Sequence, residues 1–145
     1  MILGQLGLID AALFSGAAIY INVVEQPARL GLEPRALLGE WKPAYHYGTL
    51  MQAPLATVGF LLGTAAWWRC DRTAFLVAGL LMLANLPWTL LVIFPTNRKL
   101  TETPLESADA STRSLIVRWG RLHAVRSLLG VGATAAFFLG LTLGA

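Results

Sequence analysis

The last apolar segment of the chain carries a stripe of side chains whose types and spacing could support proton transfer. Trp119, His123 and Arg126 stand at i, i+4 and i+7, which places them on one face of a helix. An imidazole exchanges protons near neutral pH, a guanidinium is a permanent cation, and an indole offers a flat apolar surface. The stripe favours a site that takes a proton from a flat substrate and holds the resulting anion. An interfacial tryptophan anchor beside a snorkelling arginine is the alternative interpretation.

A second polar cluster ends the first apolar segment. Three polar residues follow Asn22 by three, four and seven positions: Glu25, Gln26 and Arg29. At this spacing all four share one side of a helix. A charged side chain at the bilayer centre costs about 2.5 to 3.5 kcal/mol, and it normally faces the bundle interior, a partner or water. Because Glu25 is predicted at the same membrane end as Arg126, we expect these two side chains to form an ion pair.

Membrane-spanning helices must position these side chains. Of the 145 residues, 56% are hydrophobic and 13% are charged, and the mean hydropathy is +0.62. An ordinary soluble domain has about one quarter of its residues charged, and one crossing of a bilayer needs about 20 apolar residues. The sequence therefore predicts an all-α integral membrane protein, a single domain built as an up-and-down bundle of four transmembrane helices. The predicted spans are approximately residues 2–24, 49–68, 73–94 and 115–143.

The segment between the first two spans, residues 28–48, mixes charges, prolines and aromatic residues. It predicts a loop with a short surface helix, whose aromatic rings settle at the membrane interface. In the second span, Gly59 and Gly63 lie four residues apart, a spacing that lets helix backbones approach closely. We interpret these two glycines as packing residues.

The polar segment after the third span contains a candidate helix start. Thr103 and Glu106, with Pro104 between them, match a capping box. A helix running unbroken from there to Leu143 would be about 60 Å long, about twice the hydrocarbon thickness. We therefore expect it either to project from the membrane or to break near Ser111 and Thr112.

The distribution of basic residues predicts an orientation in the membrane. The loops after the first and third spans are rich in Lys and Arg, whereas the opposite end of the bundle has only Arg69 and Arg72. Because short basic loops tend to stay in the cytoplasm, we expect these two loops to be cytoplasmic. We expect the protein to lie in the plasma (inner) membrane. A single cysteine, Cys70, excludes a disulfide within the chain and a CxxC motif. The basic residues at the predicted cytoplasmic end are Arg29, Arg35, Lys42, Arg98, Lys99, Arg113, Arg118, Arg121 and Arg126.

Three short motifs, in this order along four apolar spans, carry a resemblance to a known family. They are NVVEQPAR at residues 22–29, PTNRKL at residues 95–100, and Trp119–x3–His123–x2–Arg126. With these motifs the chain resembles the anthrone-oxygenase-like family of small four-helix membrane proteins, many of which have no assigned activity. The resemblance covers nearly the whole length. It implies oxidation of anthrone-type polyketide intermediates to anthraquinones by molecular oxygen, without flavin or haem. The matching residues are Glu25, Arg29, Asn97, Trp119, His123 and Arg126.

The residues are consistent with that chemistry, and we expect no cofactor. A deprotonated anthrone is electron-rich enough to react with oxygen, so the protein needs a general base, a cation and an apolar slot. His123 is the predicted base and Arg126 the predicted cation, and the predicted catalytic set is completed by Glu25. The predicted substrate-binding residues are Asn22, Arg29, Tyr45, Trp88, Asn97 and Trp119.

Two alternatives remain open from the sequence. His46, His123 and Glu25 could form a two-histidine, one-carboxylate set for a non-haem metal ion, although nothing in their spacing demands it. Alternatively, the chain is a non-catalytic small membrane protein that binds lipid or a partner subunit, with Glu25 and Arg126 as a closed structural ion pair. A pocket at this end of the bundle would favour the enzyme.

The expected partners follow from the composition. They are the lipid bilayer and a hydrophobic small-molecule substrate, and homo-oligomerisation is left open. The scattered arginines do not form a basic domain surface, and no glycine-rich phosphate loop is present, so we expect no nucleic acid.

Overall fold

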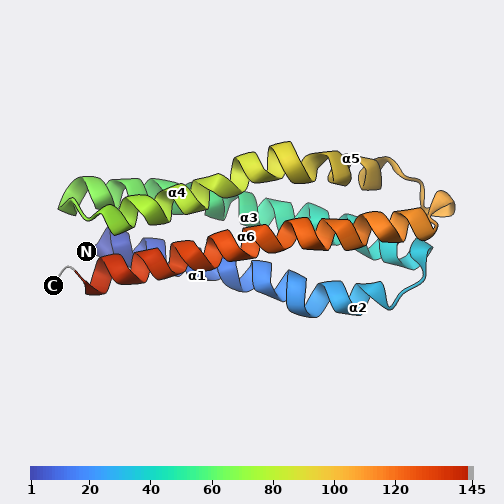
Figure 1. Ribbon diagram of the computed structural model, residues 1–145, viewed down its shortest axis with the longest axis horizontal. Coiled ribbons are helices and arrows are strands. Elements are labelled where there is room, and N and C mark those ends of the chain that lie inside the picture. Colours follow the sequence, from blue (N-terminus) through green and yellow to red (C-terminus); the bar gives the residue numbers. More distant parts are fainter. Residues whose placement is uncertain (144–145) are drawn as a thin grey trace.

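The computed structural model describes residues 1–143, and within them the chain forms four long antiparallel helical rods without a β-strand. Figure 1 shows the rods side by side, with both termini at one end and the longer loops at the other. Two rods contain a π-helical turn, and a short 3-10 helix precedes the last rod. The elements are α1 (Ile2–Tyr20), η1 (Ile21–Glu25), α2 (Gln26–Leu30), α3 (Pro34–Cys70), α4 (Thr73–Trp88), η2 (Thr89–Ile93), α5 (Phe94–Glu102), η3 (Leu105–Ser107) and α6 (Ala110–Thr142).

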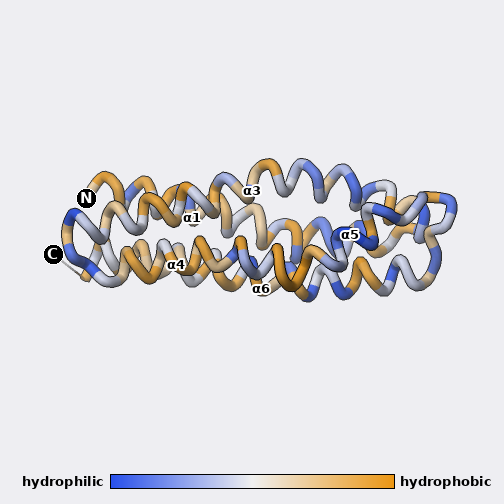
Figure 2. Tube along the Cα trace, turned by 90° about the horizontal axis from the view of Figure 1, so that it is seen from above, coloured by the Kyte–Doolittle hydropathy of each residue, from blue (hydrophilic) through white to orange (hydrophobic). Residues whose placement is uncertain are grey.

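All four rods are long and apolar enough to cross a membrane, which confirms the predicted four-helix integral membrane bundle. The 33 residues of α6 extend for about 50 Å, whereas the hydrocarbon core is about 30 Å thick. The bundle is therefore longer than the bilayer core. Polar residues gather in the half that carries the loops at residues 31–33 and 103–109, as Figure 2 shows, so this half meets the headgroups and the water beyond.

Small residues bring the rods together. α1 and α4 each pack against both α3 and α6, so the four rods form a ring around a common core. A Cβ atom on Gly63 would lie 2.7 Å from the Cα atom of Gly79, which means that the backbones of α3 and α4 touch there. A Cβ atom on Gly59 would lie 2.6 Å from Oδ2 of Asp10. Both glycines are thus packing residues, as the spacing predicted.

The segment predicted as a loop with a short surface helix is instead mostly the first part of α3. Glu33 is extended, Pro34 occupies the first helical turn, and the helix then continues without interruption to Cys70. Three side chains explain the difference, because Leu37, Leu38 and Trp41 are fully buried against the other rods. Their burial stabilises a helix in a segment whose charges and prolines indicate a loop.

The predicted capping box at Thr103 and Glu106 is wrong. Pro104 is extended and the 3-10 helix η3 follows it, whereas α6 begins after Asp109. The Asp109 side chain accepts hydrogen bonds from the backbone N–H groups of Ser111 and Thr112, and Thr112 Oγ1 accepts one from the Asp109 N–H at 3.3 Å. Hydrogen bonds from Ser111 and Thr112 also hold the pKa of this carboxyl below its usual range. The chain therefore breaks just before the point expected from its length.

Candidate active site

A cleft opens in the polar half of the bundle, where all four rods contribute lining side chains. Its cavity has a volume of about 20 Å³, and the figure rises to about 350 Å³ when the gaps between atoms and the space at the mouth are included. At about 1.5 Å per residue, the stretch of α6 from His123 to its end at Thr142 is about 29 Å long, close to the hydrocarbon thickness. With this stretch of α6 filling the hydrocarbon layer, the cleft would lie near the boundary between lipid tails and headgroups. Its polar and aromatic lining consists of Glu25, Arg29, Tyr45, Gln52, Asn97, Trp119, His123 and Arg126.

Two π-helical turns border the cleft, and each is followed by a proline two residues after its end. η1 ends at Glu25 ahead of Pro27, and η2 ends at Ile93 ahead of Pro95. Proline has no N–H to give to the preceding turn, and a π turn accommodates one extra residue in the helix. Glu25 and Ile93 both line the cleft. These turns therefore occur where the helices place residues of the candidate site.

His123 is held in one orientation by Asn22. The imidazole is 2% exposed, and its Nδ1 lies 2.8 Å from Oδ1 of Asn22. The Asn22 amide is oriented by its own Nδ2, which donates to the carbonyl oxygen of Gly120 at 2.8 Å, while Ser127 Oγ donates to the same Oδ1 at 2.8 Å. Oδ1 is therefore an acceptor, Nδ1 of a neutral His123 carries the proton, and Nε2 keeps its lone pair.

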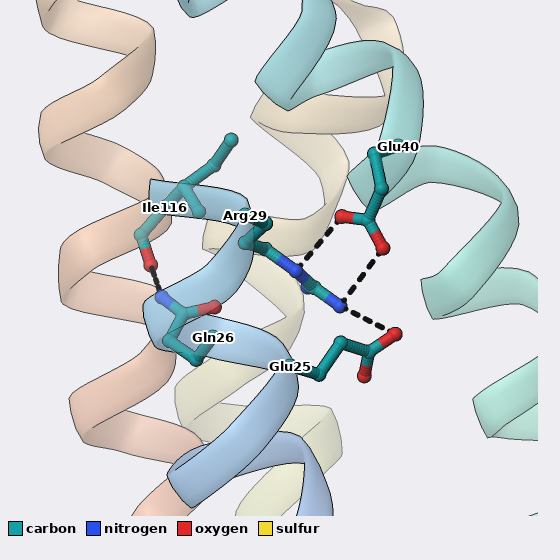
Figure 3. A network of polar contacts seen from close by, with 5 residues as sticks. All are labelled: Glu25, Gln26, Arg29, Glu40 and Ile116. Carbon is teal, nitrogen blue, oxygen red and sulfur yellow. Dashed lines mark hydrogen bonds and ion pairs between the residues drawn. The ribbon is translucent and has the colours of Figure 1, made fainter. Parts of the chain in front are cut away.

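Arg29 is neutralised by two carboxylates, one from its own rod and one from α3. Its Nη2 lies 2.8 Å from Oε1 of Glu25, and its Nε lies 2.8 Å from Oε2 of Glu40. Figure 3 shows the guanidinium between these two acids. The expected ion pair between Glu25 and Arg126 is therefore wrong, because Glu25 is engaged by the arginine four residues further along its own helix.

Arg126 has no carboxylate partner among residues 1–143. Its guanidinium lies over the ring of Phe14 at 5.6 Å, and its buried Nε makes no hydrogen bond to any described residue. Arg126 is half-buried, and a cation withdrawn from water without a counter-ion attracts an anion that can reach it. Since Arg126 lines the cleft, that anion would be a ligand.

Aromatic rings form one wall of the site. Trp41 stacks on Tyr45 with ring centroids 4.9 Å apart, and it meets Trp119 edge-on at 5.7 Å. Trp119 in turn lies 4.9 Å from the ring of His123, and the Arg29 guanidinium lies over it at 5.7 Å. Tyr45 and Trp119 line the cleft, so a flat apolar ligand would find ring surfaces beside the imidazole.

Two predicted substrate-binding residues do not line the cleft. Asn22 acts behind His123, as described above. Trp88 donates from Nε1 to the carbonyl oxygen of Leu122 at 3.0 Å and so joins α4 to α6. The other predicted residues, Arg29, Tyr45, Asn97 and Trp119, are all brought to the cleft together with His123, Arg126 and Glu25.

The alternative metal set is not assembled. His46 is exposed and its ring lies 5.2 Å from that of Tyr47, whereas His123 is buried in the cleft. Across the described part of the chain, no three His, Cys, Asp or Glu side chains are grouped so that they could hold a metal ion.

Three residues of the site were not found by sequence reasoning. Glu40 and Trp41 fall in the segment interpreted as a loop, so their helical register was not considered. Gln52 lies inside the second span, and a buried amide in an apolar helix is a signal that could have found it.

The fold and site define a four-helix membrane bundle in which a buried imidazole, an arginine without a carboxylate partner among residues 1–143 and an aromatic wall lie beside one cleft. Residues 41–136 match the family model described as anthrone oxygenase, and the chain belongs to this family. It is 29% identical to the anthrone oxygenase of Claviceps purpurea, over 94% of this chain and 87% of that protein. It is 34% identical to anthrone oxygenase tpcL of Aspergillus fumigatus, over 83% and 81% of the two chains, and 34% identical to anthrone oxygenase ptaC of Pestalotiopsis fici, over 68% and 79%. No solved structure matches this chain.

Proposed function

We propose that the protein is a membrane-embedded oxygenase that oxidises a flat, hydrophobic, anthrone-like substrate with molecular oxygen. Its relatives bear the name anthrone oxygenase, and its cleft combines ring surfaces with a base and a cation. The observation that carries the proposal is the hydrogen bond between His123 Nδ1 and Asn22, because it leaves Nε2 as the free basic nitrogen in the cleft.

Proton abstraction is the first step of the proposed reaction. His123 Nε2 takes a proton from the methylene carbon between the two aromatic rings, and the electron pair of that C–H bond moves into the rings and the carbonyl group. The product is an enolate whose negative charge is concentrated on oxygen. Arg126, which lacks a carboxylate partner among residues 1–143, would hold this oxygen.

Oxygen then reacts with the electron-rich anion. One electron passes from the enolate to O₂, the two radicals combine in a C–O bond, and the imidazolium returns its proton to give a hydroperoxide. Removal of the second proton from the same carbon forms the C=O bond as the O–O bond breaks, and the departing hydroxide takes that proton to become water. One anthrone and one O₂ thus give one anthraquinone and one water.

The position of the cleft suits such reactants. Both an apolar aromatic compound and O₂ concentrate in the lipid, and the cleft lies near the edge of the hydrocarbon layer. The steps above require only O₂ and residues of this chain, so we propose that no cofactor takes part. Elemental analysis of the purified protein, together with activity after chelation, tests this part of the proposal.

The alternative, a non-catalytic protein that binds lipid or a partner subunit, requires a closed ion pair between Glu25 and Arg126. Instead, Glu25 pairs with Arg29, and Glu25, His123 and Arg126 line a small cleft. This arrangement supports the enzyme over the structural subunit.

The decisive experiment measures anthraquinone formation and O₂ uptake by the protein in lipid nanodiscs, after subtraction of spontaneous anthrone oxidation. His123→Ala should lower the protein-dependent rate by about 10²- to 10⁴-fold, the usual contribution of a general base. His46→Ala is the matched control, since His46 is exposed and outside the cleft, and it should keep full activity. Equal rates for wild type and His123→Ala would refute the assignment of the base, and loss of activity in His46→Ala would revive the metal set.

A further inference from the structure

Gln52 is a buried amide that the proposed reaction does not use. It lies in the middle of α3, its side chain is 1% exposed, and it lines the cleft. Nε2 of this side chain makes no hydrogen bond to any residue among 1–143. An amide buried without a partner is costly, and such groups in folded proteins normally meet a ligand or an ordered water.

Asn97 repeats this situation on a different rod. It lies in α5, is 2% exposed and lines the same cleft, and its Oδ1 has no hydrogen-bond partner within the described residues. Gln52 and Asn97 therefore place an unpartnered hydrogen-bond donor and an unpartnered acceptor on two residues that line the same cleft. The buried Nε of Arg126 adds a second donor from α6.

Three other amides donate hydrogen bonds to backbone carbonyl groups. Gln26 Nε2 donates to the carbonyl oxygen of Ile116 at 2.9 Å, and Asn22 Nδ2 donates to that of Gly120 at 2.8 Å. Asn85 Nδ2 donates to its own helix. Gln26 Oε1 and Asn85 Oδ1 also lack a partner among residues 1–143, but neither side chain lines the cleft. Gln52 and Asn97 do line it, and their side chains have no hydrogen bond to a described residue.

We infer that Gln52, together with Asn97, determines substrate specificity by hydrogen bonding to the oxygen substituents of the aromatic substrate. A primary amide both donates and accepts, which matches a ring that carries a hydroxyl group close to a carbonyl group. The ligand class is therefore a hydroxylated aromatic ketone rather than a bare polycyclic hydrocarbon or an unsubstituted anthrone. This inference rests on the proposed function for the identity of the ring system.

Physical consequences follow for stability and for selectivity. Gln52→Leu removes an unpaired buried amide and replaces it with an apolar group of similar size, so the variant should fold at least as well as the wild type. The same change should remove the preference for hydroxylated ligands. Gln52→Met is a second variant that keeps the length of the side chain and removes its polar end.

Binding separates this inference from the proposed activity. The affinities of a 1,8-dihydroxyanthraquinone and of unsubstituted anthraquinone are measured in nanodiscs by quenching of tryptophan fluorescence, and the affinity ratio is compared between variants. Partition of each ligand into the lipid is common to all variants, so it cancels in that comparison. Wild type should prefer the hydroxylated ligand by about 10- to 100-fold, and Gln52→Leu and Gln52→Met should reduce this ratio by about tenfold or more.

Gln26→Leu is the matched control, because Gln26 is also a buried glutamine but its Nε2 is bonded to Ile116 and it does not line the cleft. This control should lower stability and leave the affinity ratio unchanged. The inference is overturned if wild type binds neither ligand or binds both equally. It is also overturned if both Gln52 variants keep the wild-type affinity ratio, the result expected if these amides bond only to water. Selective binding without turnover of any anthrone would support the inference and refute the proposed reaction.

Discussion

Oδ1 of Asn22 in the first rod lies 2.8 Å from Nδ1 of His123 in the last rod, and this contact leaves Nε2 of a neutral imidazole without the proton. In the proposed reaction Asn22 would be a positioning residue, since it does not line the cleft itself. The same oxygen accepts a hydrogen bond from Ser127 Oγ. Together these groups join η1 to α6 behind the candidate active site.

Replacement of Asn22 by Ala should lower kcat while leaving KM nearly unchanged. Without the acceptor, the imidazole can rotate and can carry its proton on Nε2. The fall in kcat should therefore reach at most about 10²- to 10⁴-fold, the full contribution of a general base. Steady-state kinetics in nanodiscs measure both constants. Ser127→Ala removes only the second donor to the same oxygen and should change kcat much less. A large increase in KM with constant kcat would instead assign Asn22 to substrate binding.

Replacement of Arg126 by Gln should abolish most turnover without destabilising the bundle. The guanidinium has no carboxylate partner among residues 1–143, so its removal leaves no acid without a partner and removes a half-buried charge. Loss of the cation that holds the enolate oxygen should cost about 10²- to 10³-fold in kcat. Thermal unfolding in nanodiscs and the anthrone assay are measured on the same preparation. A marked fall in Tm would show that Arg126 has a structural role.

Replacement of Arg29 by Gln should destabilise the bundle, in contrast to replacement of Arg126. Arg29 is 3% exposed and bridges Glu25 and Glu40, so its loss leaves two acids facing each other without a cation. We expect a clear decrease in Tm, and the loss should be larger than that caused by removal of either acid alone. The double variant Glu25→Gln with Arg29→Gln tests the coupling, and it should be more stable than Arg29→Gln. Equal stability of Arg29→Gln and wild type would contradict this account of the ion-pair network.

The four rods could be predicted from the sequence because few backbone conformations are stable in lipid. Within the hydrocarbon layer every N–H and C=O group must be satisfied inside the chain, so long apolar segments become helices. The stripe of Trp119, His123 and Arg126 was also predictable, since α6 is a regular α-helix and the i, i+4, i+7 rule applies to it.

The partners of the first cluster could be predicted only in part. Glu25 and Arg29 pair at i, i+4, as that rule allows, but a π turn interrupts the regular spacing at η1. Asn22 and Glu25 lie in the π turn, which rotates them relative to the residues of α2. The cluster splits as a result. Asn22 and Gln26 both donate to backbone carbonyls of α6, whereas Arg29 pairs with Glu25 and reaches Glu40 of α3. The position of Glu40 depends on the burial of neighbouring apolar side chains, which periodicity alone did not reveal.

The orientation proposed from the basic residues places the loops at residues 31–33 and 103–109 in the cytoplasm. In a Cys70→Ala background, a cysteine at exposed Arg69 and one at exposed Glu106 report on the two opposite ends of the bundle. Arg69→Cys should react with a membrane-impermeant maleimide in intact cells, and Glu106→Cys should react only after permeabilisation. The reverse pattern would invert the orientation without affecting the site.

The contact between Gly63 and Gly79 predicts which glycines the bundle needs. A methyl group on Gly63 would lie 2.7 Å from the Gly79 Cα atom and 2.7 Å from the carbonyl oxygen of Phe75, both backbone atoms that cannot rotate away. Gly63→Ala should therefore push α3 from α4 and destabilise the protein by about 1–3 kcal/mol, the usual cost of overpacking. Gly16→Ala is the matched control, since no atom lies within 4 Å of its added methyl group. Unfolding in mixed micelles measures both variants, and similar stabilities would show that the rods separate more easily than their backbone contact implies.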